Sequence, residues 1–354
     1  MHRPTLEILE RGVIAPITSF ELARGGERGR FDGGVYAADG SVCELGLQIK
    51  QAYDNVPAAT MPAPQGEPVP GRHLFGGLMQ TGHFGHFVAE CLTRVWAGRY
   101  VSGIDSTVFI PRRTGASVPG YAVSLLELLE APSPVTVVDR PTSFETLVVP
   151  RQIGRAGSGF IWGDPITQEM LSPLRRIAPS PHEKVYVSRA GLKPIDGGFV
   201  LETEIERLLE EEGYYIFRPE QHSLEEQFSV YNGARQLIFA DGSAVHVYAF
   251  CATSEQDVAI IWRRNASEYF LQQITSFSGK RPVSIAALSR LWTPDVRFGA
   301  GAQSRAELDF PTLHSMLADA GLVAGPAWDA LSETQVRDEI ARLSEATGVV
   351  YTAD

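Results

Sequence analysis

The chain has 354 residues, of which 44% are hydrophobic and 21% charged, a composition typical of folded proteins and not of disordered ones. A single core rarely grows to this length, so we expect more than one domain. The formal net charge of -11 argues against nucleic acid or an anionic membrane as the main partner. An anionic substrate would therefore need a local cluster of Arg or Lys.

Targeting signals and cysteine usage indicate where the protein works. The amino terminus is polar and lacks the apolar segment of a signal peptide, and no stretch approaches the ~18 apolar residues of a spanning helix. Cys43, Cys91 and Cys251 are widely spaced among apolar neighbours, which favours buried free thiols over disulfides or a zinc site. We expect a cytoplasmic protein, either free or peripheral at the inner face of the membrane, with self-association into a homo-oligomer left open.

The first part of the chain predicts an amino-terminal domain over residues 1–180. Dense Gly and Pro up to about residue 70 predict short strands and turns without a long helix. Apolar residues at three- and four-residue spacing predict a helix over residues 83–96, and strand-like runs follow at 135–138 and 146–149. The Gly-, Pro- and Ser-rich stretch 151–180 leads to the domain boundary.

The second part of the chain alternates between short apolar runs and amphipathic segments. Strands are predicted at 184–187, 214–217, 237–240 and 258–262, and helices at 202–212, 223–234 and 243–250. Ser223 and Glu226 have the spacing of a capping box. This alternation predicts a parallel sheet with helices on both faces, which we assign to residues 181–275. Residues 276–354 are interpreted as a helical tail packing on the two domains.

Ligands of parallel sheets bind beyond the carboxyl ends of the strands. That rule selects Ser188 and Arg189 after the first strand, residues 218–221 after the second, and Asp241, Gly242 and Ser243 after the third. A guanidinium and a small-residue turn before a helix suit a diphosphate. The alternatives are a solvated surface arginine and a glycine needed only for a tight turn.

Two polar residues open the second helix of this region. Glu226 either completes the capping box or, like Gln227, forms hydrogen bonds with hydroxyl groups of a sugar or ribose.

Three titratable residues share one face of the helix predicted over residues 83–96. His83, His86 and Glu90 lie three and four positions apart, so His86 or Glu90 could act as the general base that deprotonates a hydroxyl group. The alternatives are a solvent-facing polar surface and a zinc triad, although the spacing differs from His-Glu-x-x-His. The absence of Asp-x-Asp from the sequence argues against a divalent cation that holds phosphates, so no metal is expected. No Walker loop, dinucleotide fingerprint or nucleophile elbow occurs either.

The order of these motifs resembles glycosyltransferase family sixty-one, whose bacterial members include capsular polysaccharide biosynthesis proteins. The resemblance covers roughly residues 73–275 and rests on five motifs in order, at residues 82–90, 184–189, 202–206, 223–227 and 241–250.

The resemblance implies an α/β fold of the GT-B type, with two Rossmann-like domains facing a cleft. It also implies inverting, metal-independent transfer from a nucleotide sugar to a surface polysaccharide or lipid-linked glycan, with no cofactor besides this co-substrate. The donor would bind at Ser188, Arg189, Glu226, Gln227, Gly242 and Ser243, and the acceptor side would include His83, His86 and Glu90.

The sequence departs from the family pattern at three places. Gly197 and Gly198 stand where a second arginine is usual, Leu201 replaces an asparagine, and Asp241 replaces the histidine of a His-Gly-Ala turn. A carboxylate beside a diphosphate is unfavourable, so Asp241 would accept a donor hydroxyl or cap the helix. These departures leave open the alternative of an inactive GT-B protein that serves as a binding or scaffold partner in glycan assembly.

Overall fold

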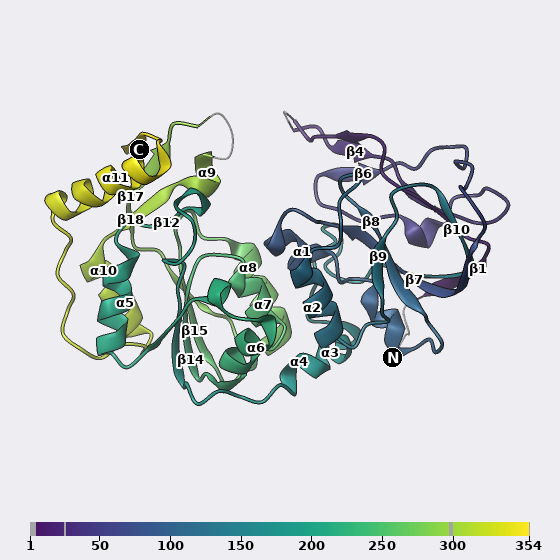
Figure 1. The fold of residues 1–354 in the computed structure, drawn as a ribbon. Helices are drawn as coiled ribbons and strands as arrows, with labels where there is room; N and C mark the ends of the chain where they lie inside the picture. The colour runs from purple at the N-terminus through teal and green to yellow at the C-terminus, as the bar shows by residue number, and fades with distance from the viewer. Residues whose placement is uncertain (1–4, 25, 297–299, 354) are drawn as a thin grey trace. The chain divides into compact units, whose positions relative to one another are not determined.

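The computed structural model describes residues 5–24, 26–296 and 300–353. The chain forms two compact units, Met1–Arg176 and Ile177–Asp354, and both contain strands and helices (Figure 1). The protein is therefore a mixed α/β protein, and each unit is described by itself below.

Unit 1 is built on a sheet that is seven-stranded within the described residues, in the order β5-β2-β10-β7-β8-β9 with β1 also pairing with β10. The strands are β1 (Leu6–Glu10), β2 (Val13–Ala15), β5 (Gly34–Tyr36), β7 (Val69–Met79), β8 (Ser106–Pro111), β9 (Val135–Val137) and β10 (Thr142–Pro150). The four strands β10, β7, β8 and β9 run parallel to one another, whereas β1 and β2 are antiparallel to β10. Every residue of β8 is buried, as expected for a parallel strand covered on both faces.

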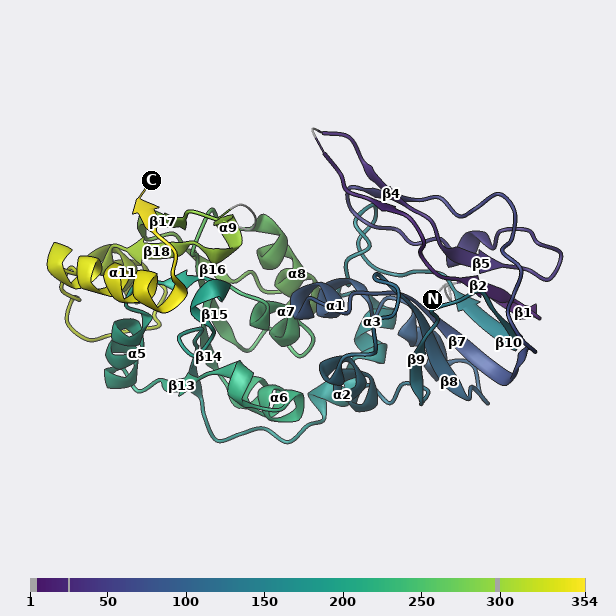
Figure 2. The ribbon, with the colours of Figure 1, turned by 45° about the horizontal axis from the view of Figure 1, so that its top comes forward.

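Helices gather on one side of these parallel strands (Figure 2). They are α1 (Phe84–Glu90), α2 (Gly120–Leu128), α3 (Pro165–Met170) and α4 (Ser172–Arg175), with the 3-10 turn η2 (Val95–Arg99). A second 3-10 turn, η1 (Glu44–Gly46), lies beside β5 (Figure 2). A small sheet contains β3 (Phe20–Glu21), β4 (Gly29–Phe31) and β6 (Tyr53–Asn55). The helix predicted over residues 83–96 is shorter than expected, because α1 ends at Glu90 and the chain continues through turns into η2.

Unit 2 is built on a parallel sheet, five-stranded within the part of the chain described, in the order β13-β11-β14-β15-β16. The strands are β11 (Lys184–Val187), β13 (Tyr215–Phe217), β14 (Gln236–Ala240), β15 (Asp257–Ile261) and β16 (Val283–Ile285). The intervening helices are α5 (Glu202–Glu211), α6 (Leu224–Gly233), α7 (Ala244–Ala249) and α8 (Glu268–Ser278). The predicted alternation of strands and helices is confirmed.

Helices cover both faces of this sheet, with α6, α7 and α8 on one face and α5 and α10 (Phe310–Asp319) on the other (Figure 1). Ile205 and Leu209 of α5 pack with Leu313 and Leu317 of α10 in the same buried cluster as the strand residues Tyr186 and Ile238. The capping box predicted for α6 is present. The hydroxyl oxygen of Ser223 accepts the backbone N–H of Glu226, and the carboxylate of Glu226 accepts the backbone N–H of Ser223.

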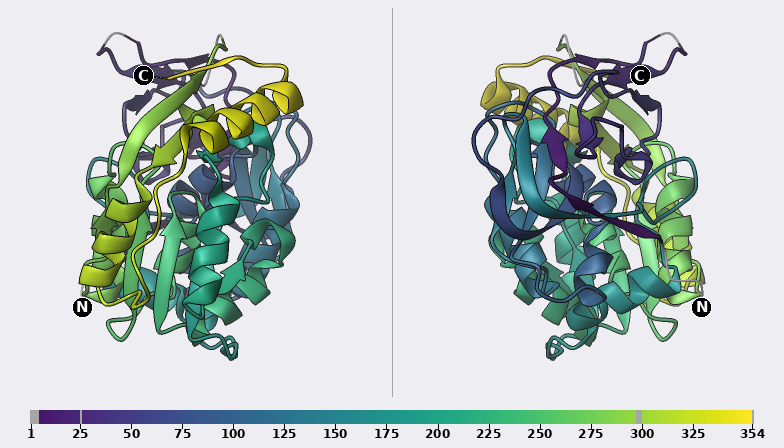
Figure 3. Two further views of the ribbon diagram at one scale, coloured as in Figure 1. Left: turned by 90° about the vertical axis from the view of Figure 1, so that its left-hand side faces the viewer. Right: turned by 90° about the vertical axis from the view of Figure 1, so that its right-hand side faces the viewer.

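The prediction of a purely helical tail over residues 276–354 is wrong. This part contains β16, β17 (Leu288–Pro294), β18 (Arg305–Leu308) and β19 (Tyr351–Ala353) besides α9 (Ala300–Gln303), α10 and α11 (Glu333–Thr347). With β12 (Gly198–Phe199) the last three strands form a second sheet, β12-β18-β17-β19, on which α11 packs through Val336, Ile340 and Leu343 (Figure 3). Short strands with little alternation in polarity carry a weak sequence signal, which is why only the helices were predicted.

Candidate active site

The sheet of unit 2 has a topological switch point between β11 and β14. From β11 the chain crosses to β13 on one side and then returns to β14 on the other. In sheets of this kind, ligands bind where the strand order reverses, beside the loops that follow such a pair of strands. Ser188 and Arg189 follow β11, and Asp241, Gly242 and Ser243 follow β14. The two predicted groups of residues meet there, since a Cβ atom placed on Gly242 would lie 2.4 Å from Nη1 of Arg189.

Ser188 lies inside a buried network instead of at the surface. It is 2% exposed, and its hydroxyl group lies 2.6 Å from a carboxylate oxygen of Glu206 and 3.1 Å from one of Glu202. Glu202 also accepts the backbone N–H of Arg189 at 2.7 Å, and Glu206 pairs with Arg218. Burial raises the pKa of Glu202, although the hydrogen bond from Arg189 opposes the shift. The network fixes the direction in which the chain leaves β11.

The guanidinium group of Arg189 lies over Gly242 and is anchored at one end, where Nη2 donates to the carbonyl oxygen of Asp196 at 3.0 Å. Its Nε atom is buried and has no hydrogen-bond partner among the described residues.

Arg263, which the sequence interpretation missed, lies beside Asp241. It follows β15, it is 5% exposed, and its Nε atom donates to the carbonyl oxygen of Asp241 at 2.9 Å and lies 3.9 Å from the Asp241 carboxylate. Burial, and next the charge of Arg189, lower the pKa of Arg263 to about 10. The rule that selected the loops after the first three strands would also have selected Arg263, because β15 was predicted as a strand.

Glu226 and Gln227 both have structural contacts. The Glu226 carboxylate is 61% exposed and accepts the backbone N–H and the hydroxyl group of Ser223, each at 2.8 Å. The buried Gln227 amide donates to the carbonyl oxygens of Pro219 and His222, which ties α6 to the loop after β13.

In unit 1, His83, His86 and Glu90 lie together at the start and end of α1. His83 is the N-cap residue, and its Nδ1 atom accepts the backbone N–H of His86 at 3.3 Å. The two imidazole rings are 4.5 Å apart, and burial together with the charge of His86 lowers the pKa of His83. One turn further along, Nδ1 of His86 lies 2.6 Å from a carboxylate oxygen of Glu90.

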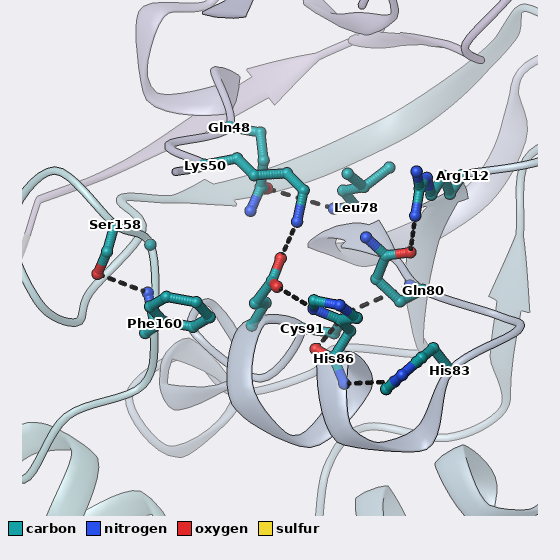
Figure 4. A network of polar contacts seen from close by, with 12 residues as sticks. Gln48, Lys50, Leu78, Gln80, His83, His86, Cys91, Arg112, Ser158 and Phe160 are labelled. Atoms are coloured by element: carbon teal, nitrogen blue, oxygen red, sulfur yellow. Dashed lines mark hydrogen bonds and ion pairs between the residues drawn. The ribbon is translucent and has the colours of Figure 1, made fainter. Parts of the chain in front are cut away.

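Lys50 completes this group and was also missed by the sequence interpretation. Its ammonium group contacts the second carboxylate oxygen of Glu90, and both side chains are 8% exposed. Figure 4 shows Lys50 and His86 pointing toward the same place from different segments. Burial would raise the pKa of Glu90, but the hydrogen bond from His86 and the charge of Lys50 outweigh it and hold this pKa below its ordinary value.

The contact with Glu90 determines which ring nitrogen of a neutral His86 carries the hydrogen. An ionised carboxylate can only accept hydrogen bonds, so Nδ1 of a neutral His86 carries the hydrogen and Nε2 has a free lone pair. The His86 side chain is 47% exposed, in contrast to Glu90. This arrangement can take up a proton at Nε2 while the buried carboxylate stabilises the imidazolium that results.

Gln80 and Arg112 follow the neighbouring strands β7 and β8 and lie near α1 (Figure 4). Nη1 of Arg112 donates to the Gln80 side chain at 3.3 Å, and the buried amide nitrogen of Gln80 has no partner among the residues described.

Comparison with known proteins identifies a family for this chain. The sequence model of the family described as Glycosyltransferase 61 matches residues 84–258, about half of the chain. The chain belongs to glycosyltransferase family 61. No curated protein matches it.

Family 61 membership makes the protein a glycosyltransferase. The family 61 match includes His86, Glu90, Arg189 and Gly242, whereas Lys50 and Arg263 lie outside it. Within the residues described, no cluster of three or more His, Cys, Asp or Glu side chains could hold a metal ion. In the same part of the chain, no helix has both the length and the apolar character needed to cross a membrane.

Proposed function

We propose that the protein is an inverting, metal-independent glycosyltransferase of the GT-B type. It moves a sugar from a nucleotide sugar to a hydroxyl group of a surface polysaccharide or a lipid-linked glycan. Family membership supports sugar transfer, and the parallel strands flanked by helices in both units support the GT-B assignment. The nucleotide sugar is a co-substrate, so the proposal invokes no cofactor. The protein acts on the cytoplasmic side, either free or peripheral at the inner face of the membrane.

The observation that carries the proposal is the contact of 2.6 Å between Nδ1 of His86 and the buried carboxylate of Glu90. In the proposed reaction, Nε2 of His86 takes the proton of the acceptor hydroxyl group, and the oxygen attacks the anomeric carbon. Glu90 stabilises the imidazolium, as in other histidine–carboxylate pairs. Lys50 does not touch the substrate; it is a positioning residue that keeps Glu90 ionised.

The bond from the anomeric carbon to the diphosphate breaks as the new bond forms, and the diphosphate leaves with its negative charge. We assign compensation of this charge to Arg189, whose guanidinium lies at the switch point over Gly242. The carboxylate of Asp241, which lies in the same turn as Gly242, is 3.9 Å from Nε of the buried Arg263. A divalent cation would need clustered oxygen ligands. The proposed site offers guanidinium groups instead.

A transfer assay tests the proposal. The protein is incubated with a panel of nucleotide sugars and glycan or lipid-linked acceptors, with and without a chelator, and the release of nucleoside diphosphate is measured. We expect acceptor-dependent release that the chelator does not reduce, and a product whose anomeric configuration is inverted by NMR. No release with any donor, together with intact folding, would favour the alternative of a catalytically silent scaffold.

A further inference from the structure

Two consecutive glycines leave space for two guanidinium groups at the carboxyl edge of the unit 2 sheet. A Cβ atom on Gly197 would lie 2.4 Å from the carbonyl oxygen of Ala302 and 2.8 Å from Nη1 of Arg263, and one on Gly198 would lie 2.5 Å from Nη1 of Arg305. Gly197 also has a φ of +69°, which disfavours any other residue. A side chain at Gly197 would clash with the backbone of Ala302 as well as with Arg263, and one at Gly198 would have to displace Arg305.

The two arginines beside Gly197 and Gly198 each have a buried nitrogen without a partner among the described residues. Arg305 donates from Nη2 to the carbonyl oxygen of Pro194 and braces the 3-10 turn η3 (Pro194–Asp196), and its Nε atom is the one without a partner. Arg263 donates from Nε to the carbonyl oxygen of Asp241, but its Nη1 atom is buried without a partner among the residues that the structure describes. A buried guanidinium donor without an acceptor is costly, and an arriving ligand that supplies one would be stabilised.

The surroundings of Arg263 favour an anion as that ligand. Arg189 contacts the same two turns as Arg263: its Nη1 atom lies over Gly242, next to Asp241, and its Nη2 atom donates to the carbonyl oxygen of Asp196, next to Gly197. Its own Nε atom is buried without a partner among the described residues. The Asp241 carboxylate lies 3.9 Å from Nε of Arg263, too far for a hydrogen bond. Two neighbouring guanidinium groups with unused donors match an anion that carries two phosphate groups.

We infer that Arg189 and Arg263 form a two-arginine clamp for the diphosphate of the donor, and that Gly197 keeps open the space that Arg263 needs. The identity of the ligand rests on the proposed function. The cation pair itself is independent of the family assignment, because Arg263 lies outside the matched residues.

Calorimetry with three ligands tests the clamp: inorganic pyrophosphate, a nucleoside diphosphate and the corresponding monophosphate. The variants are Arg263→Gln and Arg263→Lys, with Arg264→Gln as the matched control, because Arg264 is the next residue, is exposed and donates from Nη1 to the carbonyl oxygen of Gly301. Arg263→Lys keeps a charge and gives the same comparison if Arg263→Gln does not fold.

We expect Arg263→Gln to weaken pyrophosphate and diphosphate binding about ten- to a hundredfold, the effect of losing one charge-assisted hydrogen bond. Monophosphate binding should change much less, Arg263→Lys should lie in between, and Arg264→Gln should bind like the unmodified protein. The clamp is refuted if the unmodified protein binds none of these ligands, if a folded Arg263 variant keeps its affinity, or if mono- and diphosphate affinities fall equally. Pyrophosphate binding that depends on Arg263, without sugar transfer from any donor, would support the clamp and contradict the proposed function.

Discussion

Glu90 is a buried carboxylate whose charge is maintained by two neighbours, Lys50 and His86. Its pKa lies below the ordinary value although burial acts in the opposite direction. The ionised carboxylate therefore stabilises the fold above the pKa of Glu90 in the unfolded chain. This contribution is lost as the pH falls through the lower, folded-state pKa.

Replacing Lys50 tests how this charge is maintained. In Lys50→Met, burial of Glu90 is no longer opposed by the ammonium group, so the pKa of Glu90 should rise. The acidic limb of the kcat profile should move to higher pH, whereas a purely structural role would lower kcat without moving the limb. Lys280→Met is the control, because Lys280 forms an exposed ion pair with Asp257. An unchanged acidic limb in Lys50→Met would remove Lys50 from the proposed base.

Arg189 is the residue at the switch point that would bind the diphosphate of the donor. Arg189→Ala should weaken binding of a nucleoside diphosphate by ~1.5–3 kcal/mol, the usual contribution of a charge-assisted hydrogen bond. Calorimetry with the free nucleoside is the control, since a ligand without phosphates should not respond. Equal affinity of the variant and the unmodified protein for the diphosphate would exclude Arg189 from the donor site.

At the scale of elements, α6 combines a helix cap with two residues that the sequence assigned to donor binding. Ser223→Ala should lower the free energy of unfolding by ~0.5–2 kcal/mol, as loss of an N-cap does. Glu226→Gln separates the two roles of Glu226, because glutamine can complete a capping box but carries no charge. If Glu226 acts only as a cap, nucleotide affinity will be unchanged in Glu226→Gln. A clear loss of affinity with unchanged stability would instead support contact with the donor.

The elements of unit 2 could be predicted because local signals agree with the global fold. Residues 184–187 have the apolar run of a buried strand, and Ser223 and Glu226 have the capping spacing, so β11 and α6 lie where the sequence placed them. The contact between His86 and Glu90 also follows from local spacing on one helix. By contrast, Lys50 reaches Glu90 from a segment 40 residues away, and no local pattern encodes such a pairing.

At the scale of the whole molecule, each unit carries part of the proposed chemistry. The base group belongs to Met1–Arg176 and the two-arginine clamp to Ile177–Asp354. Binding and proton transfer should therefore be separable by mutation, a consequence that the final experiment uses.

Metal dependence is a property of the whole protein and can be tested without mutation. We predict that purified protein contains no stoichiometric divalent metal and that a chelator leaves turnover unchanged, because guanidinium groups compensate the diphosphate. Elemental analysis together with turnover in the chelator provides the measurement. One zinc or manganese per chain, with activity that disappears in the chelator and returns on adding the metal, would contradict the proposed mechanism.

The most direct test of the account measures turnover and nucleotide affinity together in His86→Ala and Glu90→Gln. A general base contributes typically about 10²–10⁴-fold to the rate, so both variants should lose turnover on that order. Their affinity for a nucleoside diphosphate should equal that of the unmodified protein, and His83→Ala should lose less turnover, because His83 caps α1 and does not contact Glu90 through a hydrogen bond among the described residues. Unchanged turnover in His86→Ala, or a parallel loss of turnover and nucleotide affinity in both variants, would contradict the assignment of His86 as the base.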